Sequence, residues 1–157
     1  VYQNYDTALY YFDKVYQINT EVPELYFFFG QAYEGLNDLQ TAMMYYTQNL
    51  ELDPEAINTR SRMANLNYRM GNFSEAIELN QEIASIDPTT SLPYINLGNY
   101  YILQGDTANG VNYYEKAVEL GAPPNASQFL EKYFRQIGDT GKADFYFRKS
   151  QQASTIK

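Results

Sequence analysis

The sequence predicts an all-α protein, a right-handed superhelical solenoid of antiparallel helix hairpins with about nine helices. The main observation is that three independent sets of residues recur at one period of 34 residues. Such a period is typical of stacked helical repeats. The sets are Gly30, Ala64 and Gly98; Ala42, Ala76 and Gly110; and Asp53-Pro54 with Asp87-Pro88.

Each set has a physical reason. Small side chains in the first two sets let paired helices approach closely, and proline ends a helix while restricting the residue before it. Turn-forming pairs separate the helices of each hairpin: Asn37-Asp38, Gly71-Asn72 and Gly105-Asp106. With the apolar spacing, these signals predict helices over residues 4–19, 23–36, 39–52, 56–70, 73–86, 90–104, 107–120, 124–137 and 140–153.

The residues at these positions make the sequence resemble the tetratricopeptide repeat family, whose pattern is W-x2-L-G-x2-Y, then A-x3-F, then P. The first full copy reads Tyr26-x2-Phe29-Gly30-x2-Tyr33, Ala42-x3-Tyr46 and Pro54. A later copy reads Tyr94-x2-Leu97-Gly98-x2-Tyr101. The middle copy departs from the pattern at Arg60, Met63, Ala64 and Asn67.

The resemblance covers the whole chain and predicts a single array over residues 1–157. Residues 1–20 would supply the second helix of an incomplete repeat. Full repeats are expected at 23–56, 57–90 and 91–123, with a final repeat at 124–157. The interruption at residues 121–124 is read as a stretched turn, because the pattern resumes directly after it.

Composition argues against several other classes of protein. The net charge of −8 opposes binding to nucleic acid, which needs a basic face. No cysteine or histidine is present to act as nucleophile or zinc ligand. The carboxylate pairs Glu115/Glu119 and Glu75/Glu78 fit a solvated helix face better than acid–base catalysis. We therefore expect no enzyme, cofactor, metal site or membrane-inserted segment.

In the tetratricopeptide family, the first helix of each hairpin lines a concave groove. The resemblance assigns the groove to the second, fifth, ninth, twelfth and thirteenth residues of each repeat, which share one helical stripe. These positions include Glu24, Glu34, Gly35, Asn58, Ser61 and Asn125. The residues expected to bind a peptide are Phe27, Gln31, Asn65, Tyr68, Arg69, Leu92, Ile95, Asn96, Asn99, Ile102, Leu103, Gln128, Lys132 and Arg135.

Two features of this groove lead us to expect peptide binding. The ninth-position column is Gln31, Asn65, Asn99 and Lys132, whose side chains can donate hydrogen bonds to peptide carbonyls or simply stay solvated. An apolar set follows, Leu92, Ile95, Ile102 and Leu103, which either forms a contact surface or is covered by neighbouring helices or another copy of the chain. Ile95→Asp is accordingly expected to abolish partner binding while helicity is kept.

Charge suggests the direction of a bound segment. Acids, Glu24 and Glu34, are expected at one end of the groove, and bases, Arg69, Lys132 and Arg135, towards the other. An acidic segment of the partner would then face Lys132 and Arg135.

A known variant of the family binds a C-terminal carboxylate with lysine and asparagine on successive repeats. Asn65 and Asn96 occupy two of these places, but Ser61 replaces the required lysine, and the later basic places hold Asn125 and Phe129. Binding of chaperone tails by that arrangement is not expected.

The function predicted is therefore a protein–protein interaction scaffold that binds a peptide or protein segment in its groove. The alternative is a structural spacer or self-association module of a larger protein. Its contact face on the N-terminal helix would include Val1, Tyr2, Leu9, Phe12 and Tyr16, because an unpaired repeat end exposes core surface. Partner, pathway and compartment, cytoplasmic or periplasmic, stay open.

Overall fold

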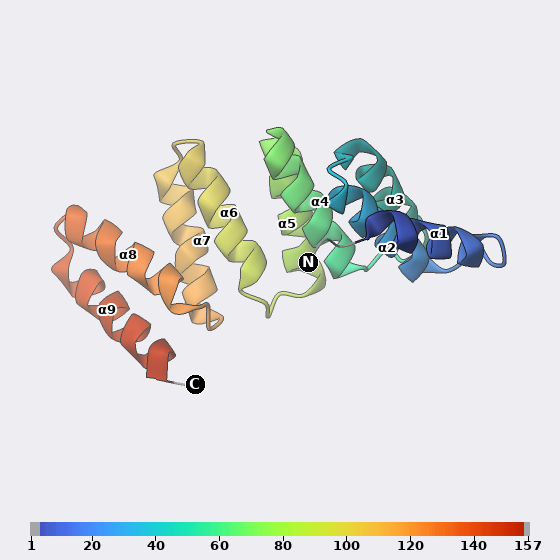
Figure 1. Ribbon diagram of the computed structural model, residues 1–157. Helices are drawn as coiled ribbons and strands as arrows, with labels where there is room; N and C mark the ends of the chain where they lie inside the picture. Colours follow the sequence, from blue (N-terminus) through green and yellow to red (C-terminus); the bar gives the residue numbers. More distant parts are fainter. Residues whose placement is uncertain (1–3, 156–157) are drawn as a thin grey trace. The chain divides into compact units, whose positions relative to one another are not determined.

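The computed structural model describes residues 4–155, with side chains as far as Gln152. Within this range the chain forms α-helices and no strand (Figure 1). The helices are α1 (Tyr5–Tyr16), α2 (Pro23–Gly35), α3 (Leu39–Leu52), α4 (Ile57–Met70), α5 (Phe73–Ile86), α6 (Leu92–Leu103), α7 (Thr107–Glu119), α8 (Pro124–Gln136) and α9 (Thr140–Thr155). The predicted all-α class is confirmed, and no helix end lies more than three residues from its expected place.

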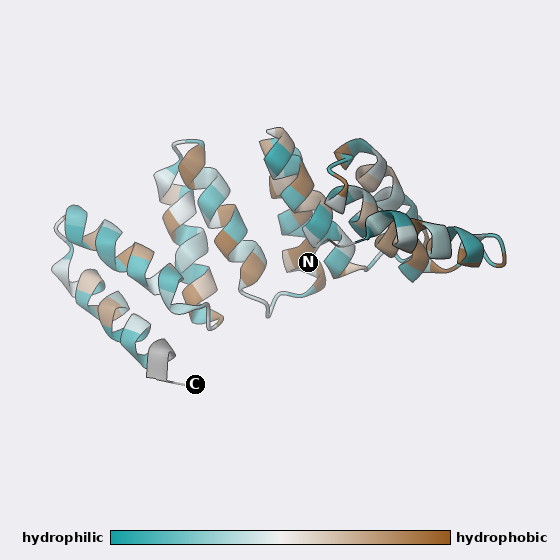
Figure 2. Cartoon of the chain, in the orientation of Figure 1, coloured by the Kyte–Doolittle hydropathy of each residue, from teal (hydrophilic) through white to brown (hydrophobic). Residues whose placement is uncertain are grey.

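The helix pairs α2/α3, α6/α7 and α8/α9 pack as the hairpins that the repeat pattern predicts. In one compact unit, Val1–Leu79, α1 packs on α2, α2 pairs with α3, and α3 packs on α4. In the second unit, Asn80–Lys157, α6 pairs with α7 and α8 with α9, while α7 packs on α8. The division falls within α5, so this helix contributes to both units. Hydrophobic and hydrophilic residues alternate along the helices, as expected for elements covered on one side (Figure 2).

The turns inside the hairpins repeat one backbone device. Asn37, Gly71, Gly105 and Gly138 have positive φ angles of 61°, 83°, 85° and 82°. Glycine and asparagine adopt this left-handed conformation more readily than other residues, which allows the chain to leave one helix and enter the next. The residue that follows caps the new helix: side chains of Asp38, Asp106 and Asp139 accept backbone N–H bonds from Thr41, Asn109 and Lys142.

Close approach of paired helices depends on the small residues of the repeat. In the first unit, the ring of Tyr46 on α3 occupies the space where a Cβ of Gly30 would lie. In the second unit, the backbones of Gly98 and Gly110 approach so closely that a Cβ on either would meet the other's carbonyl oxygen within 3.0–3.1 Å. The two small positions of each hairpin therefore do what their spacing predicts.

Tyrosines fill much of the core while keeping their hydroxyl groups paired. Tyr46 is fully buried and lies with Ala42 and Leu66 at the centre of the first unit. In the second unit, Tyr114 and Tyr146 lie within a continuous buried cluster. Such amphipathic rings suit a thin stack of helices, in which the outer end of a core side chain is near solvent.

Tyr33, Ala42, Tyr101 and Phe134 lie on the packing stripe of the repeat pattern, which predicts that all four are largely buried. This prediction is half right. Ala42 and Phe134 are buried, but Tyr33 and Tyr101 are only partly covered. Each of these two rings stacks on one face against a second-helix tyrosine, Tyr33 on Tyr45 at 5.4 Å and Tyr101 on Tyr113 at 5.3 Å. Stacking on one side leaves the remaining surface of the ring exposed.

Candidate functional site

The first unit has a pocket of about 400 Å³ that is lined by residues of α1, α2 and α4. We call it the arginine pocket; it is lined by Tyr5, Gln31, Glu34, Gly35, Arg62 and Arg69. Gln31, Glu34, Gly35 and Arg69 are groove positions assigned from the sequence. The structure thus brings these four into one pocket, whereas their role in binding stays a prediction.

Glu34 is the centre of charge in this pocket. Its side chain is only 14% exposed, and Arg69 Nη1 lies 3.3 Å from Oε1 while Arg62 Nη1 lies 3.6 Å from Oε2. Tyr46 also donates its hydroxyl proton to Glu34 Oε2 at 2.9 Å. Burial raises the pKa of Tyr46, and the Glu34 carboxylate raises it further, because both oppose a second negative charge there.

Arg62 and Tyr5 belong to the pocket although sequence reasoning did not select them. Arg62 is the sixth residue of its repeat, which is the place that Asn96 holds in the following repeat. A helical-wheel argument could have found it, because Asn58, Arg62, Asn65 and Arg69 follow an i, i+4, i+7, i+11 spacing. Tyr5 comes from the incomplete repeat, and its ring takes the space of a Cβ on Gly35.

The pairing of Glu34 with Arg69 corrects the charge arrangement expected from the sequence. Glu34 and Arg69 were assigned to opposite ends of the groove, but the structure places them in direct contact. Position within a repeat fixes the stripe on which a side chain lies. The reach of a long arginine side chain across to the neighbouring hairpin depends on packing.

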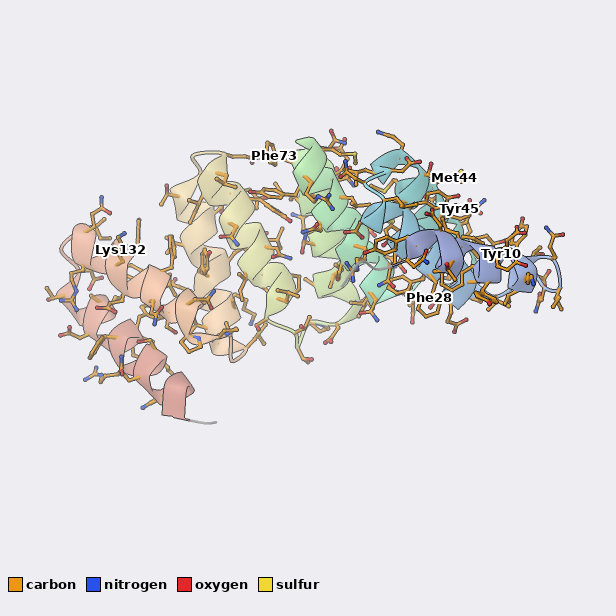
Figure 3. The ribbon with its side chains drawn as sticks, in the orientation of Figure 1. Tyr10, Phe28, Met44, Tyr45, Phe73 and Lys132 are labelled. Atoms are coloured by element: carbon orange, nitrogen blue, oxygen red, sulfur yellow. The ribbon has the colours of Figure 1, made fainter. Side chains whose placement is uncertain are left out.

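A second pocket of the first unit, about 410 Å³, lies around Phe27 and Phe28. Phe27 is half-buried against Tyr46, with the ring centroids 5.9 Å apart, and Phe28 is 45% exposed (Figure 3). Glu24 and Asn58, two further groove positions, also line this pocket. On α4, Asn65 and Tyr68 are exposed, and the Tyr68 ring meets that of Phe73 at 5.7 Å.

The apolar set of the second unit divides into two kinds of residue. Leu92 and Leu103, at the two ends of α6, are 56% and 62% exposed. Ile95 and Ile102 are half-buried and pack against the buried cluster. For these two residues, the alternative that neighbouring helices cover them is confirmed. Ile95→Asp would therefore disturb the core, and Leu103→Asp is the cleaner probe of this surface.

The asparagines of α6 take part in internal hydrogen bonds. Asn96 Nδ2 donates to Oδ1 of the buried Asn80 at 3.0 Å. Asn99 Oδ1 accepts the hydroxyl proton of Tyr114 at 2.6 Å. This bond uses the side-chain oxygen of Asn99 and orients its NH2 group. The NH2 group can donate to a peptide carbonyl.

On α8, the predicted residues Gln128, Lys132 and Arg135 are exposed. Arg135 Nη2 pairs with Glu131 at 3.1 Å and with Asp144 at 3.6 Å. Lys132 makes no ion pair within the described part of the chain, and it projects from α8 (Figure 3). An acidic partner would thus compete with existing ion pairs at Arg135 but not at Lys132.

Both carboxylates of the Glu115/Glu119 pair take part in contacts within the second unit. Glu115 Oε1 accepts from Lys142 Nζ and from the Tyr146 hydroxyl, both at 2.9 Å. Glu119 pairs with Lys116 at 3.4 Å. Among the described residues, no cluster of three or more potential ligands for a metal ion occurs, and no helix has the length and apolarity to cross a membrane.

The N-terminal helix exposes a face that matches the expected one only in part. Phe12 stacks on Phe28 at 5.8 Å, and Tyr16 meets Tyr26 at 6.1 Å, so both rings turn towards α2. The exposed apolar residues of this segment are Tyr10, Tyr11, Val15, Tyr16 and Ile18, so Tyr16 keeps part of its surface exposed, as expected. Leu9 lines a pocket with Tyr33 and Tyr45. Val1 and Tyr2 lie outside the described residues.

Antiparallel hairpins with a regular spacing of small and turn residues define a helical-repeat protein of the kind that serves as a protein-interaction scaffold. The chain belongs to the tetratricopeptide repeat family. The family model described as anaphase-promoting complex, cyclosome, subunit 3 matches residues 1–83, and the tetratricopeptide repeat model matches residues 93–120.

Solved structures of other proteins share the fold. A crystal structure of MamA has a TM-score of 0.79 at 19% identity, covering 97% of this chain and 90% of that one. MamA from Desulfovibrio magneticus RS-1 gives 0.76 at 21% identity, with 98% and 87% covered. The pilF protein of Pseudomonas aeruginosa gives 0.78 at 17% identity, with 96% and 69% covered. At these identities the likeness concerns the fold alone.

Proposed function

We propose that this chain binds an extended or helical segment of another protein, and that the binding surface is formed by the first helix of each hairpin. Within the first unit this face is formed by α2 and α4, and within the second by α6 and α8. The proposal is supported by the chemistry of these faces, which combine exposed leucines, amide side chains and arginines. Apolar anchors usually supply most of the affinity of a peptide site, and charged groups its orientation.

The arginine pocket is the observation that carries the proposal. It lies at residues that the family assigns to its groove, and its lining comes from α1, α2 and α4. Concave pockets are the usual places of ligand binding, and the polar groups in them fix the orientation of the ligand. The exposed Leu92 and Leu103 add a second contact surface, in the second unit.

Peptides selected from a displayed random library would test the proposal. The affinity of each selected peptide is measured by fluorescence anisotropy for two groove variants, Arg69→Glu and Leu103→Asp. Matched controls carry the same changes on α9, Arg148→Glu and Phe147→Asp; Phe147 is 46% exposed. We expect one groove variant to weaken each peptide at least about tenfold, as at interface hot spots.

The opposite pattern would contradict the proposal. If the α9 variants weaken the selected peptides and neither groove variant does, the binding site lies on the outer helices. Circular dichroism of all four variants is the control for folding, because each substituted residue is exposed.

The exposed apolar residues of α1 favour one second candidate function, self-association. Tyr10 and Tyr11 are 58% and 59% exposed, and Val15 is 45% exposed. A helix at a repeat end that exposes such residues gains stability by stacking on another helix. Either a further helix of a longer chain or a second copy would cover it.

A further inference from the structure

We propose that a pocket formed by α1, α2 and α3 binds the ammonium group of a lysine side chain on a partner protein. This pocket, which we call the tyrosine pocket, has a volume of about 390 Å³. Its lining includes Asp13, Tyr16, Tyr33, Met44, Tyr45 and Gln48. It shares no lining residue with the arginine pocket. The inference therefore goes beyond the proposed function, which concerns the first helix of each hairpin.

Helical spacing and ring stacking hold the walls of the tyrosine pocket in place. Asp13 and Tyr16 are three residues apart on α1, and Phe29 and Tyr33 are four apart on α2, so each pair shares one side of its helix. From α3, the Tyr45 ring stacks on Phe29 at 4.8 Å and on Tyr33 at 5.4 Å. These contacts form without a ligand, so binding does not have to order the rings.

The charge of the pocket favours a cation. Among the described residues that line it, Asp13 is the only charged one. Asp13 makes no ion pair within the described part of the chain, and the adjacent Lys14 places its Nζ 4.5 Å from the ring centroid of Tyr10. A cation from a partner would therefore meet a carboxylate that no internal cation neutralises.

Oxygen atoms gather round the same space. Burial raises the pKa of Tyr45, and the nearby groups of Tyr33, Tyr16 and Asp13 raise it further, because each opposes a negative charge on the phenol. Gln48 adds a buried side-chain oxygen that has no hydrogen-bond partner within the described residues. A donor that reaches this oxygen removes the cost of an unpaired buried acceptor. Phenol, carboxylate and amide oxygens can all accept hydrogen bonds from an ammonium group.

The arrangement of the rings favours lysine over arginine. A guanidinium group is planar and binds well when it stacks on an open ring face, whereas an ammonium group is a compact charge with three donors on a flexible four-carbon stem. Here the faces of Phe29 and Tyr33 are already engaged by Tyr45. Leu9 and Met44 provide apolar surface for the stem, and Met44 is 49% exposed on α3, so the pocket can be reached from solvent (Figure 3).

Blocked tripeptides test the pocket without a known partner. Each carries one central residue between two alanines: lysine, norleucine, acetyllysine or arginine. Binding is followed by NMR at the ring signals of Tyr33 and Tyr45. We expect saturable shifts with the lysine peptide and weaker binding of the arginine peptide. Norleucine keeps the apolar stem and acetyllysine removes the charge, so neither should shift the two tyrosines at the same concentration.

Substitutions separate the pocket from general charge effects. Asp13→Asn should weaken binding of the lysine peptide about two- to fivefold, as expected for an exposed ion pair. Met44→Glu should tighten it by a similar factor relative to Met44→Gln, which has the same shape without the charge. The matched changes Glu75→Gln and Thr47→Glu alter the net charge equally at exposed residues outside the pocket lining and should leave binding unchanged.

Four results would overturn the inference. Equal weakening by Asp13→Asn and Glu75→Gln would reveal a general charge effect. Shifts at Phe27 and Phe28 in place of the two tyrosines would assign the cation to the other pocket of the first unit. An arginine peptide that binds at least as tightly as the lysine peptide would contradict the ammonium assignment. Tighter binding of n-butylammonium than of the lysine peptide would indicate a free amine in place of a partner protein.

These failures differ from a failure of the proposed function. The tripeptides report on a pocket of α1, α2 and α3, whereas the groove variants Arg69→Glu and Leu103→Asp lie on α4 and α6. A loss of selected peptides in those variants, with no response to lysine at Tyr45, would support the groove and contradict the tyrosine pocket.

Discussion

Tyr46 lies over Gly30, with its ring in the space that any larger residue at position 30 would need. The tyrosine is fully buried, and its hydroxyl donates to Glu34 at 2.9 Å. A single contact between α2 and α3 thus joins the packing of the hairpin to the charge network of the arginine pocket.

Gly30→Ala should lower the free energy of unfolding by about 1–3 kcal/mol, because the added methyl group overpacks a tight core. Urea denaturation followed by circular dichroism measures this change. Gly141→Ala is the matched control; a Cβ there meets nothing nearer than 3.6 Å, so it should be neutral or slightly stabilising. Equal stability of the two variants would show that Tyr46 can move aside without cost.

Thr59→Val tests a buried polar contact between α3 and α4. Thr59 is 1% exposed and donates to Asn49 Oδ1, while Asn49 Nδ2 donates to the Pro23 carbonyl at 2.7 Å. Valine keeps the shape but leaves the asparagine oxygen without this donor, so we expect a loss of about 1–3 kcal/mol in unfolding experiments. Thr47→Val, at an exposed residue of α3, should cost far less. A loss no larger than that of Thr47→Val would contradict the role of this bond.

Stability should fall as the pH rises above the ordinary pKa of tyrosine. Burial is the largest cause that raises the pKa of Tyr46 and of Tyr146, followed for each by an adjacent glutamate, Glu34 or Glu115. A raised pKa in the folded state means that the unfolded chain loses its protons first. The stabilisation is therefore complete below about pH 10 and is lost progressively above it.

Denaturation curves measured from about pH 9 to about pH 11 check this effect. Tyr146→Phe removes one of the two groups, so the variant should show a shallower loss of stability than the original chain. Tyr10→Phe, at a residue 58% exposed, serves as control and should leave the slope unchanged. A slope that is the same in all three proteins would mean that the Tyr146 phenol does not control alkaline unfolding.

Self-association through α1 predicts a concentration-dependent mass. Sedimentation velocity at rising protein concentration should show a dimer that Tyr11→Glu with Val15→Glu abolishes, because both side chains are exposed on α1. Glutamates at Phe145 and Phe147, 45% and 46% exposed on α9, are the control. A chain that stays monomeric at every concentration would contradict self-association. A further helix of a longer chain would then be the candidate to cover this face.

Much of the fold could be predicted because each element carries its own local signals. Asn37, Gly71 and Gly105 mark turns through backbone conformations that few other residues adopt. Gly98 and Gly110 mark the contact between paired helices, because close approach requires a small residue whatever surrounds it. Signals of this kind act over a few residues, and they recur with the repeat.

The candidate site was only partly predictable. Helical spacing placed Gln31 and Arg69 on groove faces, and the structure brings them into one pocket. It did not select Arg62, which reaches Glu34 from the neighbouring hairpin. It left open whether Ile95 forms a contact surface or is covered by neighbouring helices, and in the structure its side chain rests against the buried cluster of the second unit.

The sequence by itself determined the helices, their turns and the pairing of helices into hairpins, because backbone conformation and small-residue spacing are local properties. Only the tertiary structure decided which long side chains meet. Phe12 turns towards Phe28 while Tyr10 stays exposed, and Glu34 is shared by two arginines. These contacts depend on how neighbouring hairpins pack, and on the reach of flexible side chains between them, which no spacing along one helix specifies.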